Sequence, residues 1–123
     1  MNPVVLCLIL VSVTLSALAQ IAFKYGMSAK VVQDAMSSGG PATIAIAATN
    51  AFIWLGLLLY GLSVVLWLGV LARIDVGQAY PFVGLAFLLT MAFGVLFLGE
   101  AWNAYRVAGT LLIIVGVVLV ARG

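Results

Sequence analysis

Four long stretches of apolar residues leave this chain very few folds to choose from. They run roughly over residues 4–23, 51–72, 76–98 and 104–121. A helix needs about 20 apolar residues to cross the hydrocarbon core of a bilayer, so each stretch predicts a transmembrane helix. Only 7% of the residues are charged, against about 25% in an ordinary soluble domain. We therefore expect an all-α fold, an integral membrane bundle of four transmembrane helices forming one domain over residues 1–123.

The first apolar stretch also imitates a secretory signal, because residues 4–19 end in Ala17-Leu18-Ala19. A signal sequence carries Lys or Arg ahead of its apolar region, and neither precedes this stretch. We therefore expect a membrane helix here. Cys7, the only cysteine, has no internal partner for a disulfide and is expected to pack as a small apolar residue.

The connections between the stretches predict which helices are neighbours. Residues 73–75 and 99–103 are short turns, which join antiparallel neighbours. The first connection, residues 24–50, is long and is interrupted by Ser-Ser-Gly-Gly-Pro at 37–41. We expect residues 28–36 to form a short helix on the membrane surface. Residues 42–48 are expected to form a second short helix or to extend the helix that follows.

Positive charges are almost evenly divided between the two membrane faces. Arg73 and Arg122 fall on one face, and Lys24, Lys30 and Arg106 fall on the other. The positive-inside rule needs a clear asymmetry. The slight excess places the first connection in the cytoplasm, and a near tie is also typical of a protein that inserts in both orientations.

Helix 1 carries a polar stripe. Ser12, Ser16, Gln20 and Lys24 recur every four residues, and each step drifts only about 40° around a helix of 3.6 residues per turn. One interpretation is hydrogen bonding between helices, with Lys24 reaching the membrane surface. The other is a polar groove that leads a headgroup inward, with Lys24 as its cation. The sequence leaves both open.

Helices 2 and 3 each add a polar or aromatic group at membrane depth. Gly56, Tyr60, Ser63 and Trp67 share a face of helix 2, which suits core packing better than a cavity wall. In helix 3, Pro81 lacks an N–H and predicts a kink. Because Gln78 and Tyr80 lie beside this kink, the segment also indicates a binding site.

Helix 4 presents Gly109 and Gly116 seven residues apart, on nearly the same face. Such a small-residue stripe allows close helix approach and predicts a dimer interface. Glu100 follows helix 3 and Arg106 begins helix 4, so each charge opposes its local helix dipole. Either the two pair with each other, or they contact a phosphate or a sugar.

All three acids, Asp34, Asp75 and Glu100, fall in loops or at helix ends. Proton-coupled transporters usually need a carboxylate at mid-membrane, and none is present. Histidine is absent, and no nucleophile–base pair, metal-ligand cluster or basic cluster can be assembled. We expect a protein that is not an enzyme and that uses no cofactor, no metal and no nucleic acid.

The sequence resembles the drug/metabolite transporter superfamily. The resemblance rests on LSALAQIAFK (residues 15–24), on residues 61–100, and on the VAG-x6-G segment of residues 107–116. Its most specific part is VGQAYPF followed by LGE. Small multidrug-resistance exporters share four helices, the helix 1 Lys and the helix 3 Tyr. Their helix 1 Glu falls at Ser16 here, and their helix 3 Trp falls at Val83.

A second branch of the superfamily is more similar. Small four-helix subunits like those of the aminoarabinose-phosphoundecaprenol flippase share Ser16, Gln20 and Lys24, the VLW of residues 65–67, the AYP of residues 79–81, and Glu100. This resemblance implies a multi-pass protein of the bacterial inner membrane that moves a polyprenyl-phosphate-linked sugar between leaflets. It also implies a homodimer, or a heterodimer with a similar subunit.

The expected path for the headgroup follows Ser16, Gln20 and Tyr80, with Lys24 and Arg106 holding the phosphate. The full set of predicted substrate-binding residues is Ser16, Gln20, Lys24, Trp67, Gln78, Tyr80, Glu100 and Arg106. Two alternatives stay open: an exporter of small cationic compounds, and a non-transporting accessory subunit of a membrane enzyme.

Overall fold

The computed structural model describes residues 2–123, and every regular element in that range is helical. In chain order the elements are α1 (Pro3–Met27), α2 (Lys30–Ser37), α3 (Ala42–Ala47), α4 (Ala51–Leu71), α5 (Val76–Ala79), the 3-10 turn η1 (Tyr80–Phe82), α6 (Val83–Leu98) and α7 (Ala104–Arg122). Four helical spans are long and apolar enough to cross a membrane: α1, α4, the α5–α6 unit over Val76–Leu98, and α7. The prediction of an all-α membrane fold with four spans is confirmed.

The ends of the spans are set by local sequence. Asn2, Asn50 and Asn103 precede α1, α4 and α7, and each side-chain oxygen accepts a backbone N–H two or three residues further on, at 2.8 to 3.0 Å. Asparagine is a preferred N-cap because it satisfies an N–H that has no partner within the helix. Gly99 ends α6 with φ 65°, a left-handed conformation that glycine adopts without strain.

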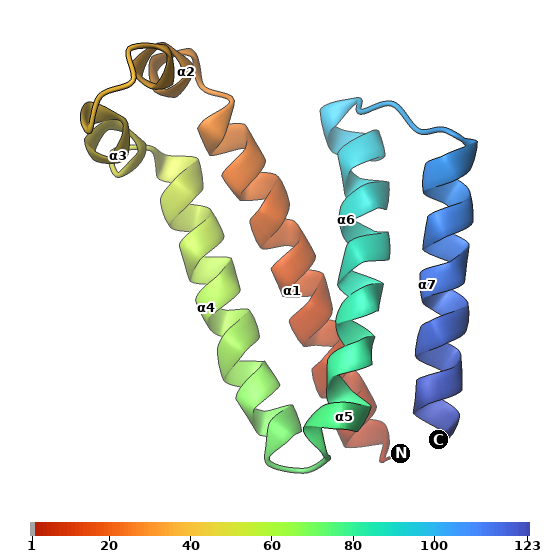
Figure 1. Cartoon of the computed structure of the whole chain (residues 1–123). Coiled ribbons are helices and arrows are strands. Elements are labelled where there is room, and N and C mark those ends of the chain that lie inside the picture. The colour runs from red at the N-terminus through yellow and green to blue at the C-terminus, as the bar shows by residue number, and fades with distance from the viewer. Residues whose placement is uncertain (1) are drawn as a thin grey trace.

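Helix α1 lies at the centre of the bundle. It packs along α4 on one side and against α6 on the other, whereas α7 packs mainly on α6 and η1. The α1–α4 pair and the α6–α7 pair converge near α5 and spread apart toward the end that carries α2 and α3 (Figure 1). Both chain ends lie at the convergent end.

The seam between α1 and α4 is close. A Cβ at Gly56 would lie 2.5 Å from the Phe23 ring and 3.1 Å from the Ala19 carbonyl oxygen. Ser12 and Ser63 are buried there, and each hydroxyl donates to the other residue's carbonyl, at 2.8 and 2.9 Å. Ser12 therefore fits the helix-packing interpretation of the polar stripe.

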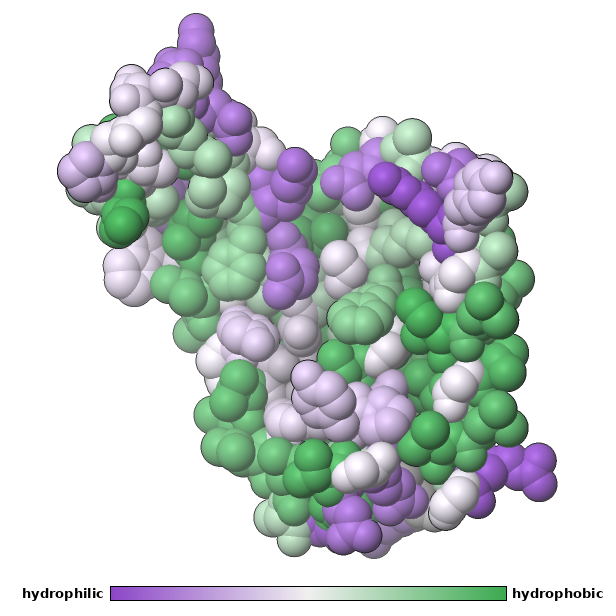
Figure 2. All heavy atoms as spheres, viewed as in Figure 1, coloured by the Kyte–Doolittle hydropathy of each residue, from purple (hydrophilic) through white to green (hydrophobic). Residues whose placement is uncertain are grey.

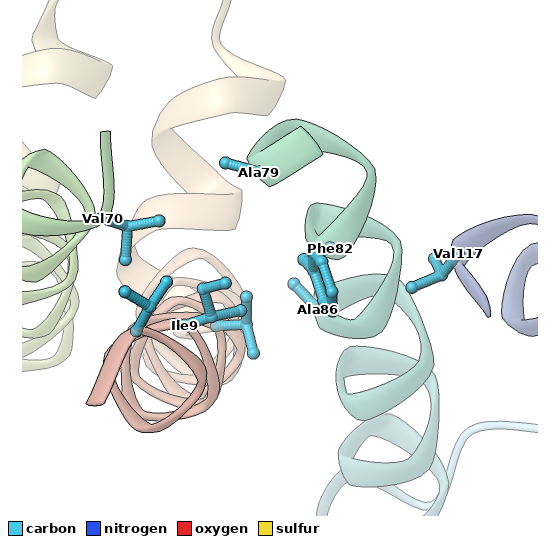
Figure 3. Close-up of a cluster of buried hydrophobic side chains, with 8 residues drawn as sticks. Ile9, Val70, Ala79, Phe82, Ala86 and Val117 are labelled. Carbon is cyan, nitrogen blue, oxygen red and sulfur yellow. The ribbon is translucent and has the colours of Figure 1, made fainter. Parts of the chain in front are cut away.

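The core lies at the convergent end. Figure 3 shows Ile9 of α1 beside Val70, with Phe82 and Ala86 between α1 and Val117 of α7. Val5, Val13 and Ala79 complete the buried cluster. Helix α7 joins it because Gly84 has no side chain: a Cβ there would lie 2.8 Å from Ile113 Cγ2. The two helix pairs are thus joined by packed side chains at this end.

Helix α1 is longer than predicted, because it ends at Met27 rather than at Phe23. This last turn contacts a neighbour: the amide of Asn50, the N-cap of α4, donates to the Gly26 carbonyl at 3.4 Å. Lys24 therefore belongs to the last turn of α1 rather than to the loop. Asn50 also begins α4 separately from α3, so the second short helix does not extend the following span.

Candidate functional site

A polar groove runs between α1, α4 and α6. It consists of two overlapping hollows, of about 560 and about 180 Å³, which share Ser16, Tyr60, Val83 and Ala86. Figure 2 shows a column of hydrophilic and intermediate residues between α4 and α6, with hydrophobic residues on both flanks. We call these two hollows together the central groove. Its polar and aromatic lining is Ser12, Ser16, Gln20, Tyr60, Ser63, Trp67, Tyr80, Phe87, Thr90 and Glu100.

The helical repeat explains how α4 serves both the seam and the groove. Gly56, Ser63 and Val70 recur every seven residues, and all three are buried. Tyr60 and Trp67 each follow a member of this stripe by four residues. Four residues turn a helix about 40° past a full circle, so these two aromatics lie at the edge of the seam, where they face the groove. The face predicted from sequence is therefore divided between packing and the groove.

The η1 turn brings Tyr80 to the groove. The α-helical segment α5 ends at Ala79 and the 3-10 turn containing Pro81 follows, before α6 resumes at Val83. Proline removes one backbone donor from a helix interior, and a 3-10 segment accommodates that loss. Tyr80 lines the groove from this turn. Gln78 does not: it lines a separate hollow with Asp75 and Gly123 at the convergent end.

Glu100 enters the groove from the other end. Its side chain folds back along α6, so that a Cβ at Gly94 would lie 2.5 Å from Glu100 Oε1. Its backbone N–H donates to the Gly94 carbonyl at 3.1 Å. Arg106 does not pair with it within residues 2–123, because the guanidinium instead donates to the Ala101 carbonyl at 2.6 Å.

The structure thus brings together five of the eight residues predicted to bind substrate: Ser16, Gln20, Trp67, Tyr80 and Glu100 line the central groove. Lys24 and Arg106 are exposed, and neither lines it. Gly109 and Gly116 lie on the open face of α7, where a Cβ would meet no atom within 4 Å.

Tyr60 and Thr90 line the groove, although neither was predicted as a substrate-binding residue. Two further functional candidates were also not predicted from the sequence. One is Gly94, described above. The other is Tyr25, whose hydroxyl donates to the Phe97 carbonyl at 3.0 Å and ties the end of α1 to the end of α6. Neither residue can be recognised in the sequence. Gly94 contributes only the space that a side chain would otherwise fill, and Tyr25 bonds a backbone atom 72 residues away.

The lining defines the chemistry that the groove offers. Hydroxyl and amide groups both donate and accept hydrogen bonds, which matches the hydroxyls of a sugar. One carboxylate contributes a negative charge. Within residues 2–123, no cluster of three His, Cys, Asp or Glu side chains has the arrangement of a metal site. The groove is therefore suited to holding a polar, hydroxylated group beside apolar surface.

Comparison with known proteins identifies the family of the chain. Residues 40–122 match the EamA-like transporter family. A probable 4-amino-4-deoxy-L-arabinose-phosphoundecaprenol flippase subunit ArnE of Pseudomonas aeruginosa is 42% identical over 69 residues, which cover 56% of this chain and 60% of that protein. The chain thus matches less than two thirds of that relative's length.

Two other relatives align over larger shares of this chain. The probable ArnE subunit of Pseudomonas savastanoi is 35% identical over 108 residues, covering 88% of this chain and 89% of that protein. A probable ArnF subunit of the same flippase in Erwinia tasmaniensis is 37% identical over 73 residues, 58% of each chain. No solved structure shows a significant match. The resemblance to the drug/metabolite transporters is confirmed, and this multi-pass membrane protein belongs to the EamA-like transporter family.

Proposed function

We propose that this chain is a transporter subunit that moves a polyprenyl-phosphate-linked sugar between the leaflets of a bacterial inner membrane. The central groove carries the proposal. On the Val76–Leu98 span the lining residues run from Tyr80 to Met91, a distance of 11 residues. That is about 16.5 Å at about 1.5 Å per residue, or about half of a hydrocarbon core about 30 Å thick.

The physical obstacle to lipid flipping is the headgroup. Moving a polar group from water into hydrocarbon without a hydrogen-bond partner costs about 2 to 7 kcal/mol of free energy. In the proposed mechanism Ser16, Gln20, Tyr60 and Tyr80 replace the water that the sugar loses. The tail stays in lipid alongside the exposed apolar faces of α4 and α6. This division of labour needs no bond to be made or broken, so we propose transport rather than catalysis.

The names of the relatives support the substrate class, because they specify a sugar carried on phosphoundecaprenol. Lys24 and Arg106 are exposed at the same end of the bundle as Glu100. We retain them as contacts for a phosphate at the membrane surface. Gln78 is not placed on the path, since it lines the hollow at the convergent end.

We further propose that the working unit is a dimer, either of two copies or of this chain with a similar subunit. Among residues 2–123, nothing lies within 4 Å of where a Cβ at Gly109 or Gly116 of α7 would be. Small residues allow helices to approach closely in a membrane. Native mass spectrometry from mild detergent would count the subunits, and a monomer alone would contradict the dimer.

The experiment that tests the function measures transfer of a polyprenyl-phosphate-linked sugar across reconstituted vesicles. Gln20→Ala removes one hydrogen-bonding partner, worth about 0.5 to 1.5 kcal/mol, so transfer is expected to fall about two- to twelvefold. Thr14→Ala is the matched control: Thr14 lies on α1 outside the groove and bonds its own helix at the Leu10 carbonyl. Unchanged transfer in both Gln20→Ala and Lys24→Ala would refute this site.

One observation favours a second candidate, an exporter of small cationic compounds, because Glu100 gives the groove a negative charge. In that case drug binding in detergent would release protons, which the flippase hypothesis does not require. An accessory subunit of a membrane enzyme predicts a stable complex with that enzyme and no transfer by the purified protein.

A further inference from the structure

We propose that α2 and α3 together form a plate that lies in the headgroup layer of the bilayer, with its charged side toward water. Its exposed apolar side chains insert among the upper parts of the acyl chains, so the partner of this surface is membrane lipid. The α2–α3 plate lies outside the central groove, and its contact with lipid is therefore independent of what the groove carries. It gives the long first connection a role that the proposed function does not.

Helix α2 is amphipathic. At about 3.6 residues per turn, its polar and apolar residues fall on opposite sides of the helix. The polar side carries Lys30, Gln33, Asp34 and Ser37, and the apolar side carries Val31, Val32, Ala35 and Met36. This division is typical of a helix that lies along the boundary between water and an apolar phase.

The chain covers only part of this apolar side. Val32 is 1% exposed, whereas Val31 and Met36, at the two edges of the apolar side, are 63% and 48% exposed. Helix α3 packs against α2, contains no charged residue and leaves Ile44 78% exposed. Figure 2 shows hydrophilic residues at the outer tip of this end of the molecule, away from the spans. Lipid, which the spans already contact, is the apolar phase within reach of the uncovered side chains.

The length of α4 indicates the depth of the α2–α3 plate. Helix α4 has 21 residues, or about 31.5 Å at about 1.5 Å per residue, which nearly equals a hydrocarbon core about 30 Å thick. Its first residue, Ala51, therefore lies close to the edge of that core, and α3 ends four residues earlier. Trp54 donates its indole N–H to the Ala48 carbonyl at 2.5 Å. Because tryptophan is enriched at the headgroup level, this bond joins the end of α3 to a marker of that level.

The α2–α3 plate is attached too closely to leave the membrane surface. Only Ser28 and Ala29 separate α1 from α2. The Gln33 amide donates to the Met27 carbonyl at 2.6 Å, and Val32 is buried. Figure 1 shows α2 and α3 lying across the ends of α1 and α4 rather than continuing them. An inserted plate therefore fixes the depth of the α1–α4 pair in the bilayer.

The test measures the depth of single nitroxide labels on the full chain in vesicles of phosphatidylethanolamine and phosphatidylglycerol. Each label is attached to a cysteine introduced into the Cys7→Ser chain. Oxygen concentrates in the bilayer and a nickel chelate in water, so the ratio of their collision rates reports depth. Labels at Val31→Cys and Ile44→Cys should collide more often with oxygen, and a label at Asp34→Cys more often with nickel. Val65→Cys, at an exposed position within the α4 span, gives the ratio for lipid.

A second substitution tests whether α2 and α3 insert together. In the Val31→Cys chain, Ile44→Asp adds a charge that is costly to place in the bilayer. This change should lower the oxygen-to-nickel ratio of the label on α2, because the two helices pack on each other. Ser38→Asp is the matched control: it adds the same charge to an exposed polar residue and should leave the ratio unchanged.

Two results would overturn the inference while the Val65→Cys label reports lipid. Collisions mainly with nickel at either Val31→Cys or Ile44→Cys would place that helix in water. Labels that neither reagent reaches would show that protein, not lipid, covers the α2–α3 plate. An unchanged ratio in the Ile44→Asp chain would contradict joint insertion. None of these results bears on the proposed function, which the vesicle transfer assay tests separately.

Discussion

Replacing Gly56 with alanine tests whether the α1–α4 seam holds the groove in shape. The added methyl would lie 2.5 Å from the Phe23 ring and 3.1 Å from the Ala19 carbonyl oxygen. The ring can turn, but the carbonyl belongs to the backbone of a helix whose residue 19 is fully buried. Helix α4 must therefore move away from α1 by a few tenths of an ångström, and overpacking of this kind costs about 1 to 3 kcal/mol.

Gly61→Ala isolates that cost. Gly61 lies on the same helix, in open space, so alanine there gains the same helix propensity, about 1 kcal/mol relative to glycine, without the collision. The difference between the two variants in free energy of unfolding should therefore be about 1 to 3 kcal/mol, with Gly56→Ala the less stable. Unfolding by SDS in mixed micelles, followed by far-UV circular dichroism, measures it.

The result also bears on function. Tyr60 lies one turn after Gly56 and lines both hollows of the groove. A shift of α4 at Gly56 moves this tyrosine relative to Ser16, so Gly56→Ala is expected to slow lipid transfer while Gly61→Ala does not. If the two variants unfold at the same SDS concentration, α1 and α4 do not approach each other at Gly56 as closely as described here.

Two further predictions concern the contacts that join the helices. Ser12→Ala and Ser63→Ala should each cost about 0.6 kcal/mol, and at most about 1.7. Each hydroxyl has one hydrogen and donates it to a backbone carbonyl that alanine retains, so the 3.3 Å contact between the two hydroxyl oxygens is left without a donor. The two losses should therefore be nearly additive in the unfolding assay, and a coupling above about 1 kcal/mol would show that the hydroxyls bond each other instead. Tyr25→Phe frees the Phe97 carbonyl, so spin labels at the ends of α1 and α6 should show a longer and broader distance distribution. Tyr105→Phe, at an exposed tyrosine, should not change that distribution, and an unchanged distance in Tyr25→Phe would contradict the role of this bond.

The four spans could be predicted from sequence because length and hydropathy alone determine them. The spans predicted at 51–72 and 104–121 differ from α4 and α7 by one residue at the C-terminal end. The end of α1 differs more, because hydropathy marks where the apolar run stops whereas the helix continues to Met27. The contact that the Asn50 amide makes with the Gly26 carbonyl in this turn joins residues 24 positions apart and leaves no local signal.

The groove could be predicted only in part. The four-residue spacing of Ser16 and Gln20 placed them on one face, but spacing within one helix does not say which neighbour covers that face. Ser12 belongs to the same stripe in sequence and is bonded to α4 in the structure. The offset of about 40° between Tyr60 and the buried stripe of α4 places this side chain in the groove only because α1 is the helix that packs on the stripe. The sequence does not identify that packing partner.

The two ends of the groove are held with unequal strength, and this asymmetry limits how the protein can move. At the convergent end, Ile9, Val70 and Phe82 belong to a packed core that joins α1, α4 and the α5–α6 unit. At the other end, the hydrogen bond from Tyr25 to Phe97 is the one that joins α1 to α6 among residues 2–123. An interhelical hydrogen bond in a membrane averages about 0.6 kcal/mol, which is comparable to thermal energy. We infer that α6 and α7 move away from α1 and α4 at the Glu100 end while the core stays closed. The spin-label measurement on Tyr25→Phe tests this directly. The inference requires that the distance between α1 and α6 increases at the Glu100 end alone. An increase between the same helices at the Phe82 end would refute it.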